Sequence, residues 1–334
     1  MTSQTHFPNA WATIGRSLTT RNPRLQAATG HANIAMAKTI FMASTTIIQR
    51  WRDYDFANMY DAYGDLLDDF HVPVVVDEQP LIAVSNVTEL KKALTEHIVP
   101  RLRQPIATGV AILASRCSEA CRDVSVLPDE RLARGRRSAL SFVTSDGQRL
   151  AVSCAYTSNQ WTSRQLNGSE NHQPHPLLRL ATSCHDVGTR YGFIFSDHEL
   201  VVARVSGTPT AGLIEWQSTP WEAAGPGVLT VNLSLFLMVI MAMHDSHRPI
   251  LPHRYPFPVN FWYHFQNVDG DWVRRHHLSR REVFIIYQEP SLSSQMTFPS
   301  RMCTSLSDLP HRHLFPLPVR SLLCSCHYAF PNAD

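Results

Sequence analysis

One apolar segment, residues 228–243, sets the strongest constraint on what this chain can fold into. It is 16 residues long and carries Thr230, Asn232 and Ser234 within it. A helix needs about 20 predominantly apolar residues to cross the hydrocarbon layer of a membrane, so this segment is too short to span one. Glycine and proline precede it at 225–227 and Pro249 follows it, which is typical of a single helix of ordinary length. The segment therefore predicts a helix buried in a large core, and no association with a membrane.

The overall composition is that of a globular protein. The 334 residues are 44% apolar and 17% charged, which excludes a disordered chain. A formal net charge of +2 excludes a surface that is basic throughout, as many nucleic-acid-binding domains have. A local patch of arginines is still compatible with this balance.

The cysteines bear on the compartment. The first 30 residues lack the continuous apolar stretch of a secretory signal, so the seven cysteines are expected to be free thiols. We therefore expect an intracellular protein of the nucleus or cytoplasm that is not secreted. The composition leaves the oligomeric state open.

The middle third of the chain predicts strands around a helix. Residues 138–144 and 149–157 read as a hairpin, because the Asp-Gly pair at 146–147 is a strong turn signal. A helix is expected at 176–187, ended by Gly188. Further strands are expected at 191–195, 199–205 and 213–217. This order predicts an α+β fold in which a mixed β-sheet has flanking helices.

Three regions are expected along the chain. Residues 1–84 form an N-terminal region that is partly helical, with a helix at 34–54 and short strands at 72–76 and 81–84. Residues 85–248 form the α+β core, which begins with a helical stretch at 88–121 that Pro100 and Pro105 break or kink. Residues 249–334 are rich in proline and histidine, so we expect one strand at 281–287 and weak order towards the end.

Several blocks of sequence occur in an order that resembles a large group of fungal proteins. The first block, residues 187–202, follows the expected helix and is followed by Pro220-Trp221 and the apolar helix. Trp272, His276-His277 and residues 278–281 also fit, so the resemblance covers about 85–285. That group resembles the PD-(D/E)XK nucleases, which implies a restriction-endonuclease-like core.

In nucleases of this kind two strands present an Asp and then an acid-x-Lys triplet to Mg²⁺, which activates a water for phosphodiester hydrolysis. The anchors Arg137, Leu150, Ser158 and Trp161 set the matching register here. In that register Ala139 replaces the first Asp, Cys154 replaces the second acid and Tyr156 replaces the Lys. The resemblance therefore implies a degenerate copy with no metal and no cofactor.

The distribution of lysine agrees with this interpretation. Only three of the 30 basic residues are lysines, at positions 38, 91 and 92. Because no lysine follows position 92, no alignment of the 138–157 hairpin with the motif can supply the lysine of the acid-x-Lys triplet. We therefore expect no lysine in the nuclease-like core. The sequence thus favours a non-catalytic nuclease-like protein that acts as an interaction or nucleic-acid-binding module.

An active metal-dependent nuclease with displaced carboxylates is the alternative. Asp146, together with Asp197 or Glu199, would then bind Mg²⁺, although Asp146 is more simply a turn residue before Gly147. A third hypothesis, suggested by the unusual tail, is an altered product with no stable fold.

Basic residues and thiols offer further candidates. Arg131, Arg134, Arg136 and Arg137 form the densest basic run, which either contacts phosphates or is a solvated linker, and Arg190 is a further candidate for nucleic-acid binding. Cys117 and Cys121 fit packing on one helical face better than a redox or metal site. The tail carries six potential zinc ligands without the usual spacing, at Cys303, His311, His313, Cys324, Cys326 and His327. The partner, nucleic acid or protein, is left open.

Overall fold

A seven-stranded sheet forms the centre of the computed structural model, which describes residues 11–27, 39–75, 81–117, 121–167, 173–252 and 257–285. The chain divides into two units, Met1–Ile286 and Tyr287–Asp334, and the second lies outside the described residues. The strands of the sheet are β3 (Ile47–Arg50), β6 (Val124–Arg131), β7 (Arg137–Thr144), β8 (Arg149–Ala155), β9 (Tyr191–Phe195), β10 (Glu199–Thr208) and β11 (Ala211–Pro220). Their order across the sheet is β3-β11-β10-β9-β8-β7-β6.

The pairing is mixed, as expected for an α+β protein. Strands β7 and β8 form the expected hairpin, and Gly147 adopts φ +83° in its turn. Strand β8 then pairs in parallel with β9, with Val152 opposite Gly192. The crossover between them is helix α5 (His175–Val187), which ends at Gly188 in the left-handed conformation with φ 76°. Strands β9, β10 and β11 are antiparallel, and β3 joins β11 in parallel at the edge.

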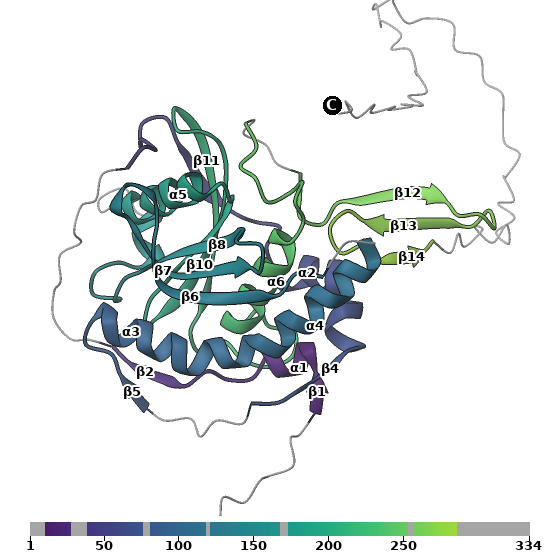
Figure 1. The fold of residues 1–334 in the computed structure, drawn as a ribbon, viewed down its shortest axis with the longest axis horizontal. Coiled ribbons are helices and arrows are strands. Elements are labelled where there is room, and N and C mark those ends of the chain that lie inside the picture. The colour runs from purple at the N-terminus through teal and green to yellow at the C-terminus, as the bar shows by residue number, and fades with distance from the viewer. Residues whose placement is uncertain are drawn as a thin grey trace, which may run out of the picture. The chain divides into compact units, whose positions relative to one another are not determined.

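Helices cover both faces of this sheet (Figure 1). Helices α4 (Val99–Cys117) and α6 (Val231–Ala242) pack on one face, and α5 packs on the other. Alternation along β9 serves both layers, because Phe193 and Phe195 join the core of α4 and α6 while Ile194 joins the core of α5. The prediction of a mixed sheet with flanking helices is confirmed.

Helix α6 is the buried helix that the apolar segment predicts, since all twelve of its residues are buried. The polar residues in and around it have partners inside the protein. Thr230 donates to the carbonyl of Leu18 at 2.6 Å, and Asn232 donates to Oδ1 of Asn22 at 3.0 Å. Among the described residues, no helix combines the length and apolar character that crossing a membrane requires.

The helical stretch expected at 88–121 is less interrupted than its prolines suggest. Helix α3 (Val87–Ala93) leads through a π-helical turn, Leu94–Ile98, directly into α4. Of the break or kink expected at Pro100 and Pro105, the break does not occur, because α4 continues through both residues. The wider π turn lies immediately before Pro100, and burial of Leu102 and Ile106 against the core stabilises the helix beyond it.

The N-terminal region differs from expectation. The described part of 34–54 contains turns and the edge strand β3 in place of a helix, because β-branched residues at 45–48 favour an extended backbone. The helices here are α1 (Ile14–Leu18) and α2 (Phe56–Asp68). Strands β4 (His71–Pro73) and β5 (Leu81–Ala83) pair with β1 (Trp11–Thr13) and β2 (Arg24–Gln26) respectively, and not with each other.

The region after 249 is more regular than its prolines predict. Strands β12 (Trp262–Gln266), β13 (Trp272–His276) and β14 (Glu282–Phe284) form an antiparallel sheet, of which only the last strand was expected. This sheet is fastened to α2, because Arg281 donates to the carbonyl of Asp61 at 2.7 Å and Arg274 pairs with the Asp61 carboxylate at 3.0 Å.

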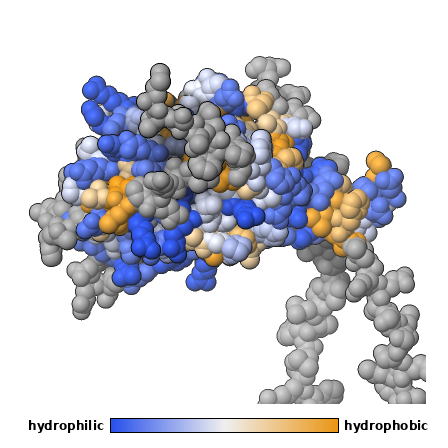
Figure 2. All heavy atoms as spheres, turned by 90° about the horizontal axis from the view of Figure 1, so that it is seen from below, coloured by the Kyte–Doolittle hydropathy of each residue, from blue (hydrophilic) through white to orange (hydrophobic). Residues whose placement is uncertain are grey.

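The face shown in Figure 2 is mostly hydrophilic, with separate apolar patches. Among the exposed large apolar residues of the described part are Phe284 of β14 and Val268, which lies between β12 and β13.

Candidate functional site

The three positions that the proposed resemblance aligns with the nuclease motif come together around one cavity at the carboxyl end of β8. Ala139, Cys154 and Tyr156 line this cavity of about 280 Å³. The other lining residues are Val87, Lys91, Arg137, Ala155, Gln160 and Arg179. The 138–157 hairpin also lies beside β9, as the resemblance requires.

The cationic residues of the cavity come from three different elements. Arg137 is the first residue of β7, Lys91 lies on α3 and Arg179 lies on α5. The ammonium group of Lys91 contacts the Asp129 carboxylate, and Nη1 of Arg179 lies 3.5 Å from the Tyr156 hydroxyl. The fold thus places three positive side chains around Ala139, Cys154 and Tyr156.

The side chains at the motif positions cannot serve as ligands for Mg²⁺. Ala139 has no donor atom, and burial raises the pKa of the Cys154 thiol to about 11. Burial also raises the pKa of Tyr156, so both groups are neutral at pH 7. No carboxylate is among the residues that line this cavity. The cavity therefore does not fit a hard divalent cation, which prefers charged oxygen ligands.

Asp197 and Glu199 have structural partners. Asp197 accepts hydrogen bonds from the backbone and hydroxyl of Ser158, at 2.5 and 2.7 Å. Glu199 accepts the same pair of bonds from Ser163, at 2.5 and 2.7 Å. Both carboxylates are buried and hold the loop that follows β8.

Asp146 lies at the other end of β8. It occupies the turn before this strand, where it contacts the Thr144 hydroxyl, and the Thr144 contact lowers its pKa. Asp197 lies beyond the far end of the strand, beside Ser158. Because β8 has seven residues, the two ends are roughly 20 Å apart at about 3.3 Å per residue. Asp146 therefore cannot share a metal with Asp197 or Glu199, and the described residues contain no group of three or more His, Cys, Asp or Glu that could hold one.

The predicted arginines do not form one surface. The basic run is no linker, because residues 132–136 make the tight connection between β6 and β7. Arg136 forms an ion pair with Asp186 of α5, whereas the side chain of Arg134 is outside the described part. Arg190 is only 3% exposed and its guanidinium donates to the Tyr191 hydroxyl at 3.1 Å. This burial corrects the expectation that Arg190 contacts a nucleic acid.

Sequence reasoning missed three polar residues of the cavity, Lys91, Gln160 and Arg179. The expectation that no lysine belongs to the core is wrong, since Lys91 reaches the cavity from α3, outside the hairpin that the motif concerns. Arg179 lies between two apolar residues of an amphipathic helix, where no motif marks it. Only the packing of α3 and α5 against the end of β8 brings these side chains together.

The remaining thiols form no site in the described residues. Cys117 ends α4 and Cys121 is exposed beyond it, so the expected packing of both on one helical face is wrong. The tail residues considered for zinc, from Cys303 to His327, lie outside the described residues.

The comparisons with known proteins add no support to the resemblance, which still rests on the residue pattern alone. No protein-family model, no curated protein and no solved structure matches the chain.

Proposed function

We propose that this protein is a non-catalytic relative of the PD-(D/E)XK nucleases that keeps the core arrangement and binds a phosphate-bearing partner, foremost a nucleic acid. One observation carries this proposal. The cavity at the motif positions contains Ala139, Cys154 and Tyr156 in place of acids and a lysine, and cations surround them. Hydrolysis assisted by Mg²⁺ needs carboxylates at such a place, whereas binding of an anion needs positive charge and hydrogen-bond donors.

The arrangement of strands supports the same proposal. A hairpin followed by a helical crossover to a parallel strand is what the resemblance implies, and β7, β8, α5 and β9 have this order. The displaced-carboxylate alternative loses its support, because Asp146 lies at the opposite end of β8 from Asp197 and Glu199.

The catalytic half of the proposal is tested with the purified full chain. Labelled single-stranded and double-stranded DNA and RNA are incubated with Mg²⁺ or Mn²⁺, and no cleavage is expected. Metal-dependent cleavage that a substitution in the 139–156 hairpin abolishes would overturn the proposal.

The binding half is tested by fluorescence anisotropy with the same labelled strands at several salt concentrations. Phosphate contacts release counterions, so affinity is expected to fall as salt rises, with a shallow slope because few cations face the cavity. Affinity that does not depend on salt would contradict recognition through phosphate.

A further inference from the structure

The polar side chains around the cavity at the end of β8 are unusual for the place where the nuclease pattern has its metal ligands. Its polar lining consists of Lys91, Arg137, Arg179 and Gln160, together with the neutral Cys154 and Tyr156. Gln160 uses its Oε1 to accept from the backbone of Thr157 at 3.1 Å, which leaves its amide N–H groups as donors. Every strongly polar group around the cavity can therefore donate a hydrogen bond to an anion.

The charge of the cavity favours a dianion. Lys91, Arg137 and Arg179 carry three positive charges, and Asp129 beside Lys91 offsets one of them. Among the described residues no carboxylate pairs with Arg137. This arginine is exposed and lies where the loop between β6 and β7 ends. Arginine offers two parallel N–H groups that match the oxygens of a phosphate group.

The size of the cavity limits what can enter it. A volume of about 280 Å³ is slightly below the range of about 300–1,000 Å³ that holds drug-sized ligands. It has room for a tetrahedral oxyanion and some water. A phosphate monoester can enter it with its phosphate group first.

We propose that this cavity is a metal-free binding site for a phosphate dianion, either inorganic phosphate or the terminal phosphate of a phosphate monoester. The inference rests on the proposed function, since it names the ligand class of the same site. Lys91 approaches from the helix layer on one face of the sheet and Arg179 from α5 on the other. Arg137 lines the site from the start of β7. The three cations would neutralise the charge of the phosphate, as a metal ion does in an active nuclease.

The test uses the full chain in EDTA at constant ionic strength, titrated with sodium phosphate in a calorimeter and compared with sodium chloride. Phosphate is expected to bind and to raise the melting temperature, whereas chloride is not. Arg137→Gln and Arg179→Gln are each expected to weaken phosphate binding about tenfold or more, the effect of losing one charge-assisted hydrogen bond. Arg137 is exposed, so its variant tests the site even if the half-buried Arg179 variant does not fold.

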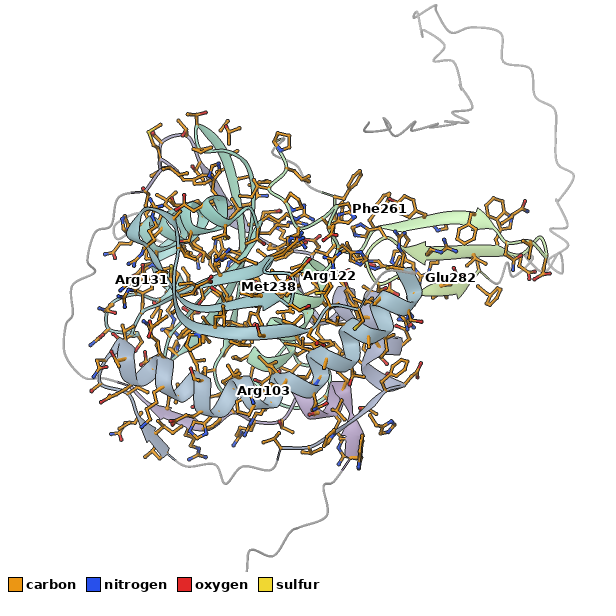
Figure 3. The ribbon with its side chains drawn as sticks, in the orientation of Figure 1. Arg103, Arg122, Arg131, Met238, Phe261 and Glu282 are labelled. Carbon is orange, nitrogen blue, oxygen red and sulfur yellow. The ribbon has the colours of Figure 1, made fainter. Side chains whose placement is uncertain are left out.

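Arg103→Gln is the matched control, because it removes the same charge from an exposed residue of α4. Arg103 follows Lys91 by twelve residues, which is roughly 18 Å along a helix. Figure 3 shows it on α4, well separated from Arg131 at the β6–β7 end of the sheet. This variant is expected to bind phosphate like the unaltered protein.

A second arm distinguishes the two sources of phosphate. A short oligonucleotide with a 5′-phosphate is compared with the same strand ending in a hydroxyl. Tighter binding of the phosphorylated strand, lost in Arg137→Gln, assigns the site to strand ends, and binding of inorganic phosphate alone assigns it to the free ion.

Three results would overturn the inference. The first is the absence of phosphate binding, and the second is an equal loss of binding in Arg103→Gln. The third is phosphate binding that appears only when Mg²⁺ replaces EDTA. None of these results uses the cleavage or anisotropy assays with nucleic acid, so a failure of this inference is distinguishable from a failure of the proposed function.

Discussion

Asp197 accepts two hydrogen bonds from the single residue Ser158, one from its backbone N–H at 2.5 Å and one from its hydroxyl at 2.7 Å. The pair joins the turn after β9 to the loop after β8, so two parallel strands are tied together at their carboxyl ends. The Asp197 carboxylate is 5% exposed, and it serves the loop rather than a metal.

Removing the Asp197 carboxylate is expected to destabilise the protein. Asp197→Ala should lower the free energy of unfolding by about 2–3 kcal/mol, because two partly buried donors of Ser158 lose a charged acceptor. Urea unfolding measures the change, and Asp269→Ala, at an exposed carboxylate in the turn between β12 and β13, is the matched control. A loss no greater than that of the control would contradict the role given to Asp197.

A methyl group at Gly192 is expected to disturb the packing between β9 and α5. A Cβ there would lie 2.7 Å from Sγ of Cys184 and 2.9 Å from Cδ1 of Leu180. Overpacking of a well-filled core costs about 1–3 kcal/mol, so Gly192→Ala should lower the melting temperature. Combining it with Cys184→Ala removes the closest contact and should recover part of the loss, whereas full additivity of the two losses would contradict the predicted clash.

Mild acid is expected to destabilise the fold through three histidines. Burial lowers the pKa of His247 and of His276 from 6.5 to about 4, and lowers that of His277 to about 3. Below pH 6.5 the unfolded chain therefore binds protons that the folded chain does not bind, so stability falls as pH falls. The slope is about 1.4 kcal/mol per pH unit for each such proton.

Urea unfolding at several values between pH 7.5 and about 5 measures this effect before most carboxylates titrate. Nε2 of His276 and of His277 contacts the carbonyl of Val259, at 2.7 and 3.0 Å, and this hydrogen bond raises the pKa of both rings, but burial lowers it more. A free energy of unfolding that stays constant from pH 7.5 to 5 would exclude this pH dependence.

A carboxylate placed in the cavity is expected to suppress phosphate binding. Cys154→Asp adds a negative charge among Lys91, Arg137 and Arg179, so phosphate should bind about tenfold or more weakly. Cys154→Asn has nearly the same shape without the charge and should retain most of the affinity. Calorimetry with inorganic phosphate compares the two variants, and equal losses would show that shape, not charge, determines binding.

Elements with local signals could be predicted from the sequence. The Asp146-Gly147 turn, the Gly188 stop and the continuous apolar run of α6 identified β7, β8, α5 and α6 close to their observed bounds. These signals depend on the φ angle or hydrophobicity of a few neighbouring residues, which the sequence states directly.

Elements that depend on distant partners could not be found in this way. Strand β6 was missed because it carries Pro128, and a proline argues against a strand in the interior of a sheet. The proline is tolerated because β6 lies at the edge of the sheet. Strand β3 was expected to be helical, and its parallel pairing with β11 joins residues more than 160 positions apart. No local pattern records such a pairing.

The sequence by itself determined the class of fold and the buried helix, and it shows that neither position 139 nor position 154 carries an acid. These follow from periodicity, from turn chemistry and from which atoms a side chain contains. Only the tertiary structure decided which side chains surround Ala139 and Cys154, because Lys91 and Arg179 belong to helices on opposite faces of the sheet. They meet Arg137 only when both helices pack against the end of β8, and that packing forms the cationic cavity for which we propose an anion.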